Sequence, residues 1–385
     1  MPMPADVVRA VASVAGKNAP LHAPEIGGNA WTYVKECLDT EWVSSAGSYV
    51  DRFEKMLCEI TGARHAVATM NGTAALHVCL ILAGVRPGDE VIVPALSFVA
   101  TVNAIAYAGA IPHFVDCEMD TLGIDAAKLV RRLAVVAERR GDTVVNKETG
   151  RRIAAIVPVH VFGHACDLDG LLAAAGRWDM PLVEDAAESL GTSYRGRHTG
   201  TFGRLAALSF NGNKIVTTGG GGAVLTNDPG LGRAARHLTT TAKLPHPWEF
   251  VHDQVGYNYR LPNLNAALGC AQLEQLPSFV ERKRRIAERY ARAFAGIEGV
   301  RFFTEAAPSR SNYWLNVIIL APESAGMKEP ILRALNDAGL TSRPAWTPLN
   351  RLPMYARAPA DNLSTTDAVY ARLINIPSSP RLADA

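Results

Sequence analysis

Cysteine pairs, an excess of one charge and long apolar runs are all missing from this chain of 385 residues. The six cysteines are widely separated and include no CxxC pair, a pattern typical of reduced packing residues in a cytoplasmic protein rather than of disulfides or a metal site. Lysine and arginine number 39 against 37 acidic residues and are scattered, which argues against nucleic acid as a partner. No stretch is long enough to span a membrane, and the first residues lack the basic start and apolar run of a signal peptide.

Apolar residues make up 48% of the chain, enough for one large core and a smaller one, so we expect a soluble enzyme with two lobes. From about residue 66 to residue 227, runs rich in valine and isoleucine alternate with helical patterns, as βαβ units require. The expected strands are AVATM, EVIVPA, PHFVD, AAIVPVHVF, PLVEDA, AALSF and GAVLTND, and the expected helices are AALHVCLILAGV, ATVNAIAYAG, AAKLVRRLAVVAERR and LDGLLAAAGRW. This order predicts an α/β sandwich with a mostly parallel sheet, whose active site lies where strands end and helices begin.

The chain changes character after Pro262. A long helical pattern, expected to break or kink at Pro277, runs to Ala295, and the short strands and helices of an α+β lobe follow. We therefore predict an N-terminal arm and large α/β domain over residues 1–261, and a small α+β domain over residues 262–385. The polar segment GDTVVNKETGRR is expected to be a surface excursion of the larger domain.

The segment that begins at Asn71 follows an expected strand and opens an expected helix. Gly72 permits a tight turn, and the backbone N–H groups of Gly72, Thr73 and Ala74 lie at the positive end of the helix dipole, where a phosphate can bind. The Thr73 hydroxyl adds a donor. A plain structural cap explains the same residues equally well.

Other side chains suited to a flat, charged heterocycle follow later strands. Phe98, in PALSF, can stack on such a ring or simply belong to the core. Glu184 and Asp185 end a buried strand, and because strand residues alternate in direction, only one of them can face the ring; we choose Asp185. If that heterocycle carries a phenolic oxygen, Glu188 can approach it; otherwise Glu188 can be a solvated side chain.

Lys214 follows a strand end in LSFNGNK and precedes a run of glycines that can admit a bulky ligand. Its amine must lose a proton to attack an aldehyde, and burial or nearby positive charge favours that loss in lysines that form Schiff bases. Ser209, five residues earlier, can turn its hydroxyl to the same phosphate. Neither GxGxxG nor GxxxxGK[ST] is present, so the glycine run is no nucleotide loop.

These candidate residues follow in chain order, each at the end of an expected strand. In this arrangement the chain resembles the fold-type-I nucleotide-sugar aminotransferases of the DegT type over nearly its full length. The motifs that carry the resemblance are EWVSSAGSYVDRFE, NGTAALH, PALSFVATVNAI, PVHVFGHACDLD, EDAAESLG, SFNGNKIVTTGGGG, GYNYRLPNLNAALGCAQLE and SRPAW.

The resemblance implies a cytoplasmic transaminase with pyridoxal 5'-phosphate (PLP) as cofactor and no metal. Lys214 would be the catalytic residue: it would hold PLP as a Schiff base and later move the proton between the amine-bearing carbon and the cofactor. Asp185 would pair with the pyridinium nitrogen, and Phe98 would stack on the ring.

The remaining contacts implied by the resemblance concern the phosphate. Gly72, Thr73 and Ser209 would hold it from their own subunit. Asn258, within GYNYR, would reach the phosphate of the neighbouring subunit, which implies a homodimer with shared active sites. As a residue type, Asn258 also fits a turn before the long helix.

Within the family, EIGGNAWTYVKECLDTEWVSSAG, NKETGRR, TTTAKLPHPWEF and RSNYWLN are most similar to one branch. That branch moves the amino group of L-glutamate to position 4 of UDP-4-keto-6-deoxy-N-acetylglucosamine, for surface glycans of the bacillosamine and legionaminic type. A GDP-4-keto-6-deoxymannose or 3-keto-sugar aminotransferase is the alternative. Relatives commonly have a histidine two residues after the position of Pro348, where this chain has Asn350, and the difference bears on substrate preference.

Other functions are less well supported by the same residues. A dehydratase branch of the family carries histidine in place of Lys214, and a nicotinamide oxidoreductase needs a glycine fingerprint that is missing. A PLP-binding regulatory protein would keep the site but needs a DNA-binding segment, which this chain lacks. Arg260 and Arg343 are candidates for the donor carboxylate or for structural ion pairs. His160 and His164 can border the sugar, but a strand histidine is more often structural.

Overall fold

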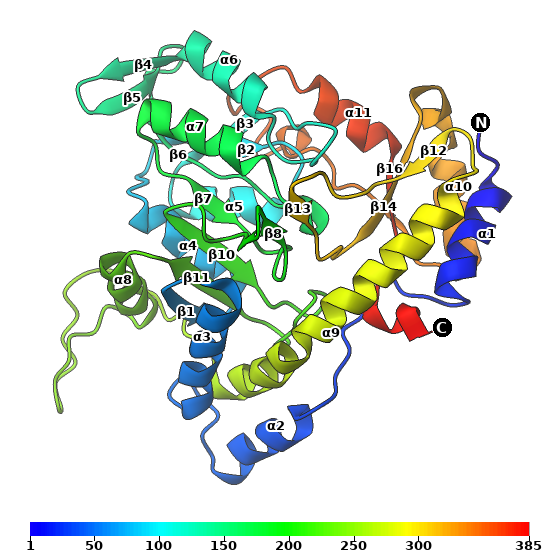
Figure 1. The fold of residues 1–385 in the computed structure, drawn as a ribbon. Helices are drawn as coiled ribbons and strands as arrows, with labels where there is room; N and C mark the ends of the chain where they lie inside the picture. The colour runs from blue at the N-terminus through cyan, green and yellow to red at the C-terminus, as the bar shows by residue number, and fades with distance from the viewer. Residues whose placement is uncertain (385) are drawn as a thin grey trace.

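Two sets of strands lie edge to edge in the larger lobe of the computed structural model, which describes residues 1–384 (Figure 1). Isolated parallel bridges from Ile156 to Leu182 and from Val159 to Asp185 join the two sets. Within them, β11 runs antiparallel to both of its neighbours and the other pairs are parallel, as the sequence predicts. In spatial order the strands are β1 (His65–Thr69), β11 (Gly222–Thr226), β10 (Leu205–Ser209) and β7 (Val183–Asp185), then β6 (Ile153–Ile156), β2 (Glu90–Pro94) and β3 (Ile111–Val115).

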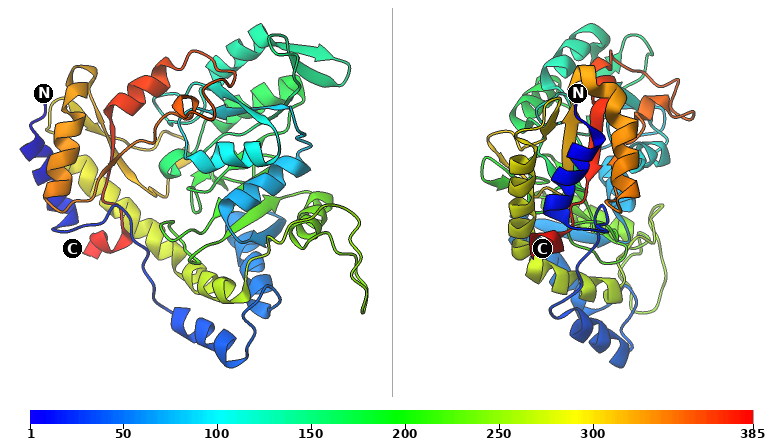
Figure 2. Two further views of the ribbon diagram at one scale, coloured as in Figure 1. Left: turned by 180° about the vertical axis from the view of Figure 1, so that it is seen from behind. Right: turned by 90° about the vertical axis from the view of Figure 1, so that its right-hand side faces the viewer.

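Helices cover both faces of this sheet, because successive strand residues bury their side chains on opposite sides. Val67 of β1 packs with the helices of one face, whereas Ala66 and Ala68 pack with those of the other. The first face, in front in the left view of Figure 2, carries α4 (Gly72–Leu82), α5 (Val99–Tyr107) and α8 (Pro229–Thr239). The second carries α3 (Ser48–Thr61), α6 (Ala126–Val136), α7 (Leu168–Trp178) and the first part of α9 (Asn263–Phe294).

The smaller lobe is built on an antiparallel sheet at the far end of α9. Its strands are β12 (Val300–Phe302), β14 (Asn316–Leu320), β16 (Leu373–Ile376) and β15 (Arg343–Pro344), with helices α10 (Lys328–Asp337) and α11 (Ser364–Arg372) beside them. Outside these two sheets lie α2 (Ala30–Asp39) and a small three-stranded sheet of β13 (Ser309–Arg310), β8 (Ser193–Tyr194) and β9 (Arg197–His198).

The first helix, α1 (Pro4–Ala15), packs against α9 and α10. Its Val7 and Val11 share a core with Ile331 and Ile374 of the smaller lobe. The division into residues 1–261 and 262–385 stays a proposal. It places α1 in the first part, although α1 packs against α9 and α10 of the second part.

One expectation about the helices is narrowed and another is wrong. The sequence predicts a break or a kink in α9 at Pro277, and the helix is not broken there, because buried Leu273, Leu276 and Phe279 hold the turns on both sides of the proline against the core. Residues 137–140 do not extend α6. They form β4 (Ala137–Arg140), which pairs with β5 (Thr143–Asn146) around a Gly-Asp turn, and the Asn146 amide anchors this hairpin by donating 2.8 Å to buried Glu90.

Across residues 1–384, no helix is long and apolar enough to cross a membrane. The cysteines of the chain are free thiols, and all but Cys58 are buried.

Candidate active site

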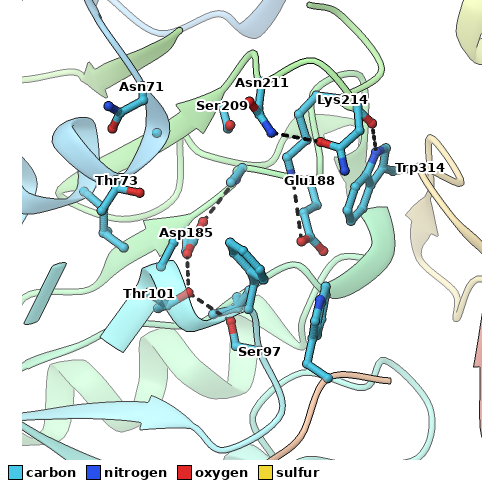
Figure 3. A pocket seen from close by; sticks show the side chains of 18 residues that line it. Asn71, Thr73, Ser97, Thr101, Asp185, Glu188, Ser209, Asn211, Lys214 and Trp314 are labelled. Carbon is cyan, nitrogen blue, oxygen red and sulfur yellow. Dashed lines mark hydrogen bonds and ion pairs between the residues drawn. The ribbon is translucent and has the colours of Figure 1, made fainter. Parts of the chain in front are cut away.

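A cavity of about 340 Å³ opens where β7 and β10 end and α4 and α5 begin (Figure 3). This is the place at which the sequence predicts the site. The structure brings Gly72, Thr73, Phe98, Asp185, Glu188, Ser209 and Lys214 together around it. The other residues that line it are Asn71, Leu76, Ser97, Ala100, Thr101, Val159, Ala187, Asn211, Asn213, Trp314 and Trp346.

The start of α4 forms one end of the cavity. The Asn71 side chain accepts from the Ala74 N–H at 2.8 Å, and the Ala75 N–H makes the first backbone bond of the helix. The N–H groups of Gly72 and Thr73 therefore precede the bonded part of the helix, at the cavity, where they can donate to an anion. A β-carbon on Gly72 would lie 2.8 Å from that of Ser209, so only glycine lets the Ser209 hydroxyl approach these amides.

Asp185 is buried at the floor of the cavity, at the end of β7. It accepts a hydrogen bond from Thr101 at 2.8 Å and one from the Ala187 N–H at 3.2 Å, and Thr101 in turn contacts Ser97 (Figure 3). Burial raises its pKa, because no ion pair to this carboxylate forms within residues 1–384. A cation placed in the cavity would reverse that effect. Asp185 is thus suited to a protonated ring nitrogen.

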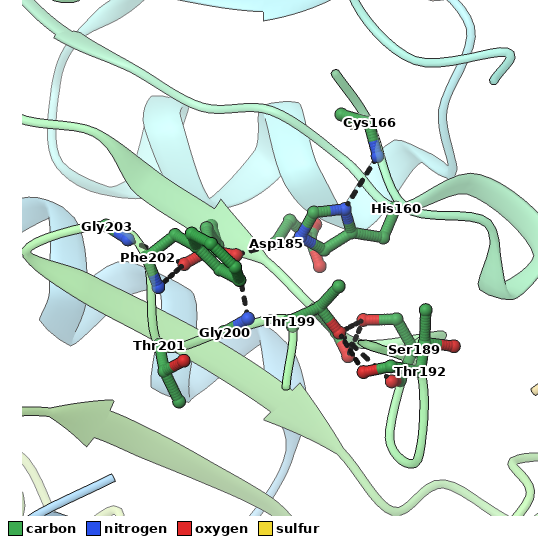
Figure 4. A network of polar contacts seen from close by, with 12 residues as sticks. His160, Cys166, Asp185, Ser189, Thr192, Thr199, Gly200, Thr201, Phe202 and Gly203 are labelled. Carbon is green, nitrogen blue, oxygen red and sulfur yellow. Dashed lines mark hydrogen bonds and ion pairs between the residues drawn. The ribbon is translucent and has the colours of Figure 1, made fainter. Parts of the chain in front are cut away.

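Glu184, its neighbour in the chain, does not line the cavity and belongs to a separate network, whose members His160, Gly200, Phe202 and Gly203 are labelled in Figure 4. Its carboxylate accepts from the N–H groups of Gly200, Phe202 and Gly203 at 2.7 Å each, and from Nε2 of His160 at 3.0 Å. The Cys166 N–H donates to Nδ1 of His160, so the imidazole proton lies on Nε2. Glu184 is therefore a structural residue, and strand alternation separates it from Asp185 as expected.

Lys214 reaches the cavity from the connection between β10 and β11. Its Nζ lies 3.8 Å from the centre of the Trp314 ring and 3.5 Å from Oε1 of Glu188. The indole of Trp314 is fixed in turn, because it donates to the Asn213 carbonyl at 2.8 Å. The amine is held in place by an aromatic face and a carboxylate, with 12% of its side chain exposed.

Aromatic rings line the opposite wall of the cavity. Trp346 stacks on Phe162 with 4.8 Å between ring centres, and Phe98 lies 6.2 Å from Trp346. Phe98 is 49% exposed. It therefore does not belong to the core, which was the alternative interpretation of this residue from the sequence. A flat ring can lie against it.

Several residues that the sequence suggests for the site lie outside the cavity. Ala74 is capped by Asn71, and exposed Asn258 forms an isolated bridge with Thr240; neither lines the cavity of its own chain. Arg260 forms an ion pair with Glu54 at 2.7 Å. Of the two roles that the sequence allows for Arg260, the structure thus shows the structural ion pair.

The other peripheral candidates also have structural surroundings. Arg343 bonds to Asn336 at the surface. His164 packs between Phe303 and Tyr313, where burial lowers its pKa to about 4. Asn350 lies in a short turn, Leu349–Arg351, beside the cavity-lining segment but outside the cavity.

Sequence reasoning missed Thr101, Trp314 and Trp346 as site residues. Thr101 lies one helical turn after Phe98 in SFVAT, a spacing that returns it to the same side of α5. The two tryptophans come from the smaller lobe, and only their place in the motifs NYWLN and SRPAW marks them.

These surroundings fit PLP. The amides at the start of α4 suit its phosphate, Asp185 suits its ring nitrogen, and Lys214 suits its aldehyde carbon. An α/β fold that directs a largely buried lysine amine into such a cavity suits a PLP-dependent enzyme.

Comparison with known proteins narrows this class. The profile of the DegT/DnrJ/EryC1/StrS aminotransferase family matches residues 24–385. GDP-perosamine synthases from Caulobacter vibrioides and Escherichia coli O157:H7 are 36% and 35% identical, covering 94% and 96% of this chain and 94% and 95% of those proteins. The crystal structure of the aminotransferase TlmJ from Streptoalloteichus hindustanus matches with a TM-score of 0.84 and 29% identity over 94% of each chain. The chain therefore belongs to the DegT/DnrJ/EryC1/StrS family and is a PLP-dependent sugar aminotransferase of nucleotide-sugar pathways.

Proposed function

We propose that this enzyme transfers the amino group of L-glutamate to position 4 of GDP-4-keto-6-deoxymannose. The observation that carries the proposal is the similarity, over nearly the whole chain, to two proteins named GDP-perosamine synthase. It replaces the UDP-4-keto-6-deoxy-N-acetylglucosamine expected from the sequence motifs, because the relatives reported above favour the GDP-linked alternative. The UDP-linked sugar becomes the competing substrate in the test.

When bound, PLP supplies an acceptor for the electron pair left on carbon after a proton is removed. The residues of this chain do the rest. Gly72, Thr73 and Ser209 fix the phosphate, and Asp185 keeps the ring nitrogen protonated. The Nζ of Lys214 would take the proton from the amine-bearing carbon and deliver it to the carbon on the other side of the nitrogen, while the wall that contains Trp314 would keep water from the amine.

The substrate proposal is tested by incubating the enzyme with isotopically labelled L-glutamate and either sugar nucleotide. We expect the label to appear in an amino sugar made from GDP-4-keto-6-deoxymannose, with at least about tenfold higher kcat/KM than for the UDP-linked sugar, because buried polar groups left unpaired by the wrong substrate cost more than lost apolar contacts. Mass spectrometry of the sugar nucleotide measures both rates. Labelling of the UDP-linked sugar alone would contradict the proposal and leave the transaminase class intact.

We further propose that the active unit is a homodimer in which Asn258 completes the phosphate site of the partner. Asn258 is exposed and does not line the cavity of its own chain. The loop between α8 and Asn258 extends away from the rest of the chain (Figure 1), and its Trp248 and Phe250 are 76% and 77% exposed. Apolar side chains this exposed are typical of an interface with another chain.

Mixed dimers test this arrangement. Lys214→Ala and Asn258→Ala subunits, each with little activity alone, are unfolded, mixed and refolded together. If Asn258 serves the partner, each mixed dimer has one intact site, and random assortment restores about a quarter of wild-type activity. If each chain serves only itself, both sites of the mixed dimer stay defective and mixing restores nothing.

A further inference from the structure

Glu188 and Lys214 form a buried ion pair that the proposed reaction leaves unexplained. Oε1 of Glu188 lies 3.5 Å from Nζ of Lys214, and only 5% of the Glu188 side chain is exposed (Figure 3). The other oxygen, Oε2, accepts the Phe162 N–H at 2.7 Å. One carboxylate oxygen is thus fixed by the backbone, and the other is directed at the reacting amine.

The turn that orients Glu188 is itself strained and held from two sides. Phe162 has a φ of 57°, in the left-handed region that residues other than glycine rarely adopt. The neighbouring Gly163 carbonyl accepts from the Thr192 and Ser311 hydroxyls at 2.8 Å each, and the Phe162 carbonyl accepts from the Leu315 N–H. Backbone strain maintained by contacts from both lobes is typical of a functional site.

The other titratable groups around the pair do not replace Glu188 as the counter-charge. Asp185, at the end of β7, is the partner of the ring nitrogen. His22, from the segment between α1 and α2, is buried, and burial together with the positive charges of Lys283 and Lys214 keeps its pKa well below the usual range. Burial also lowers the pKa of Lys283 on α9. Glu188 therefore supplies the negative charge in contact with the amine.

We propose that Glu188 positions and tunes the base of the site: its carboxylate stabilises the ammonium form of Lys214 and so sets the strength of Lys214 as a base. The inference rests on the proposed transamination. In each half-reaction Nζ takes one proton from the carbon on one side of the transferred nitrogen, becoming an ammonium, and then gives it to the carbon on the other side. Glu188 neither gains nor loses a proton, but its charge favours the state in which Nζ holds one.

This role predicts a pH dependence. Burial raises the pKa of Glu188 to about 7, against the opposing effect of Lys214. Below that pH the carboxyl is neutral and no longer stabilises the ammonium, so proton transfer slows. The rate of the glutamate half-reaction should therefore fall on the acid side of about pH 7.

Glu188→Gln tests the proposal, because glutamine can still accept the Phe162 N–H but carries no charge. In the cofactor-free chain, at about pH 9 where the wild-type carboxyl is ionised, removal of the negative charge leaves more of Lys214 as the free amine, so acetylation of the Lys214 peptide by acetic anhydride should become about tenfold faster. In the PLP-loaded enzyme the glutamate half-reaction should become about tenfold slower and lose its acid limb, because the base is weaker. Glu118→Gln, a half-buried carboxyl outside the cavity, should change neither rate.

The opposite signs of the two effects separate this role from a structural one. If Glu188 only held the fold, the variant would slow both reactions or neither, and the acid limb would remain. Unchanged or slower acetylation of Lys214 would overturn the proposal. If the wild-type protein fails to react with glutamate at all, the transamination itself is wrong, whatever acetylation reports.

Discussion

Lys214→Ala is expected to lose the absorbance of lysine-bound PLP and at least about 10³-fold in turnover, while the fold stays intact. The lysine is the amine that faces the cavity, with its Nζ held between the Trp314 ring and Glu188. Alanine removes both the nucleophile that captures the aldehyde and the base that moves the proton. Absorbance spectroscopy and a steady-state assay measure the two losses on one sample.

Lys55→Ala is the matched control for this variant. Lys55 lies on the surface of α3 with 78% of its side chain exposed, in a loose pair with Glu59. Its removal should change neither the spectrum nor the rate, since exposed pairs of this kind contribute little. Normal turnover in Lys214→Ala would remove the basis of the assigned chemistry.

Asp185→Asn is expected to keep PLP but to reduce turnover by about 10²- to 10⁴-fold. Asparagine fills the same space and can still accept from Thr101, so the cavity keeps its shape. It carries no charge, however, and cannot keep the ring nitrogen protonated, which weakens the ring as an acceptor of electrons.

Two measurements distinguish this effect from general damage. The half-reaction with glutamate should slow while PLP affinity stays within a few-fold of wild type, because the contacts proposed for the phosphate, at Gly72 and Ser209, do not involve Asp185. Unchanged turnover in Asp185→Asn would instead direct attention to Glu184, which the structure places in the separate network of His160.

The sequence predicted much of this site because its main residues obey local rules. Lys214, Asp185 and Gly72 each follow a buried strand, and parallel strands bring such positions to one edge of a sheet. Strand alternation was enough to separate Asp185 from Glu184. These inferences need no knowledge of how distant segments pack.

Contacts between distant segments could not be predicted, because local rules do not say which segments pack together. Trp314 bonds to Asn213 across 101 residues of sequence, and no periodicity links them. The contact of Glu188 with Lys214 depends on the strained turn at Phe162, which residue type alone disfavours. At Pro277, packing overrode a local rule and kept α9 continuous.

The sequence predicted the reaction more readily than it predicted which nucleotide carries the sugar. Most of the predicted residues line the cavity proposed for the cofactor, and a UDP-linked or a GDP-linked 4-keto sugar would present the same ketone to it. Similarity to the two GDP-perosamine synthases therefore moved the proposal to the GDP-linked sugar, while the roles of Lys214 and Asp185 stayed the same.

The most direct test is the absorbance spectrum of the purified protein with PLP, recorded before and after L-glutamate and again after GDP-4-keto-6-deoxymannose. Our account predicts a band of lysine-bound cofactor that glutamate removes and the keto sugar restores, which would report both half-reactions in one cuvette. A protein that forms no such band with added PLP would contradict the account at its centre.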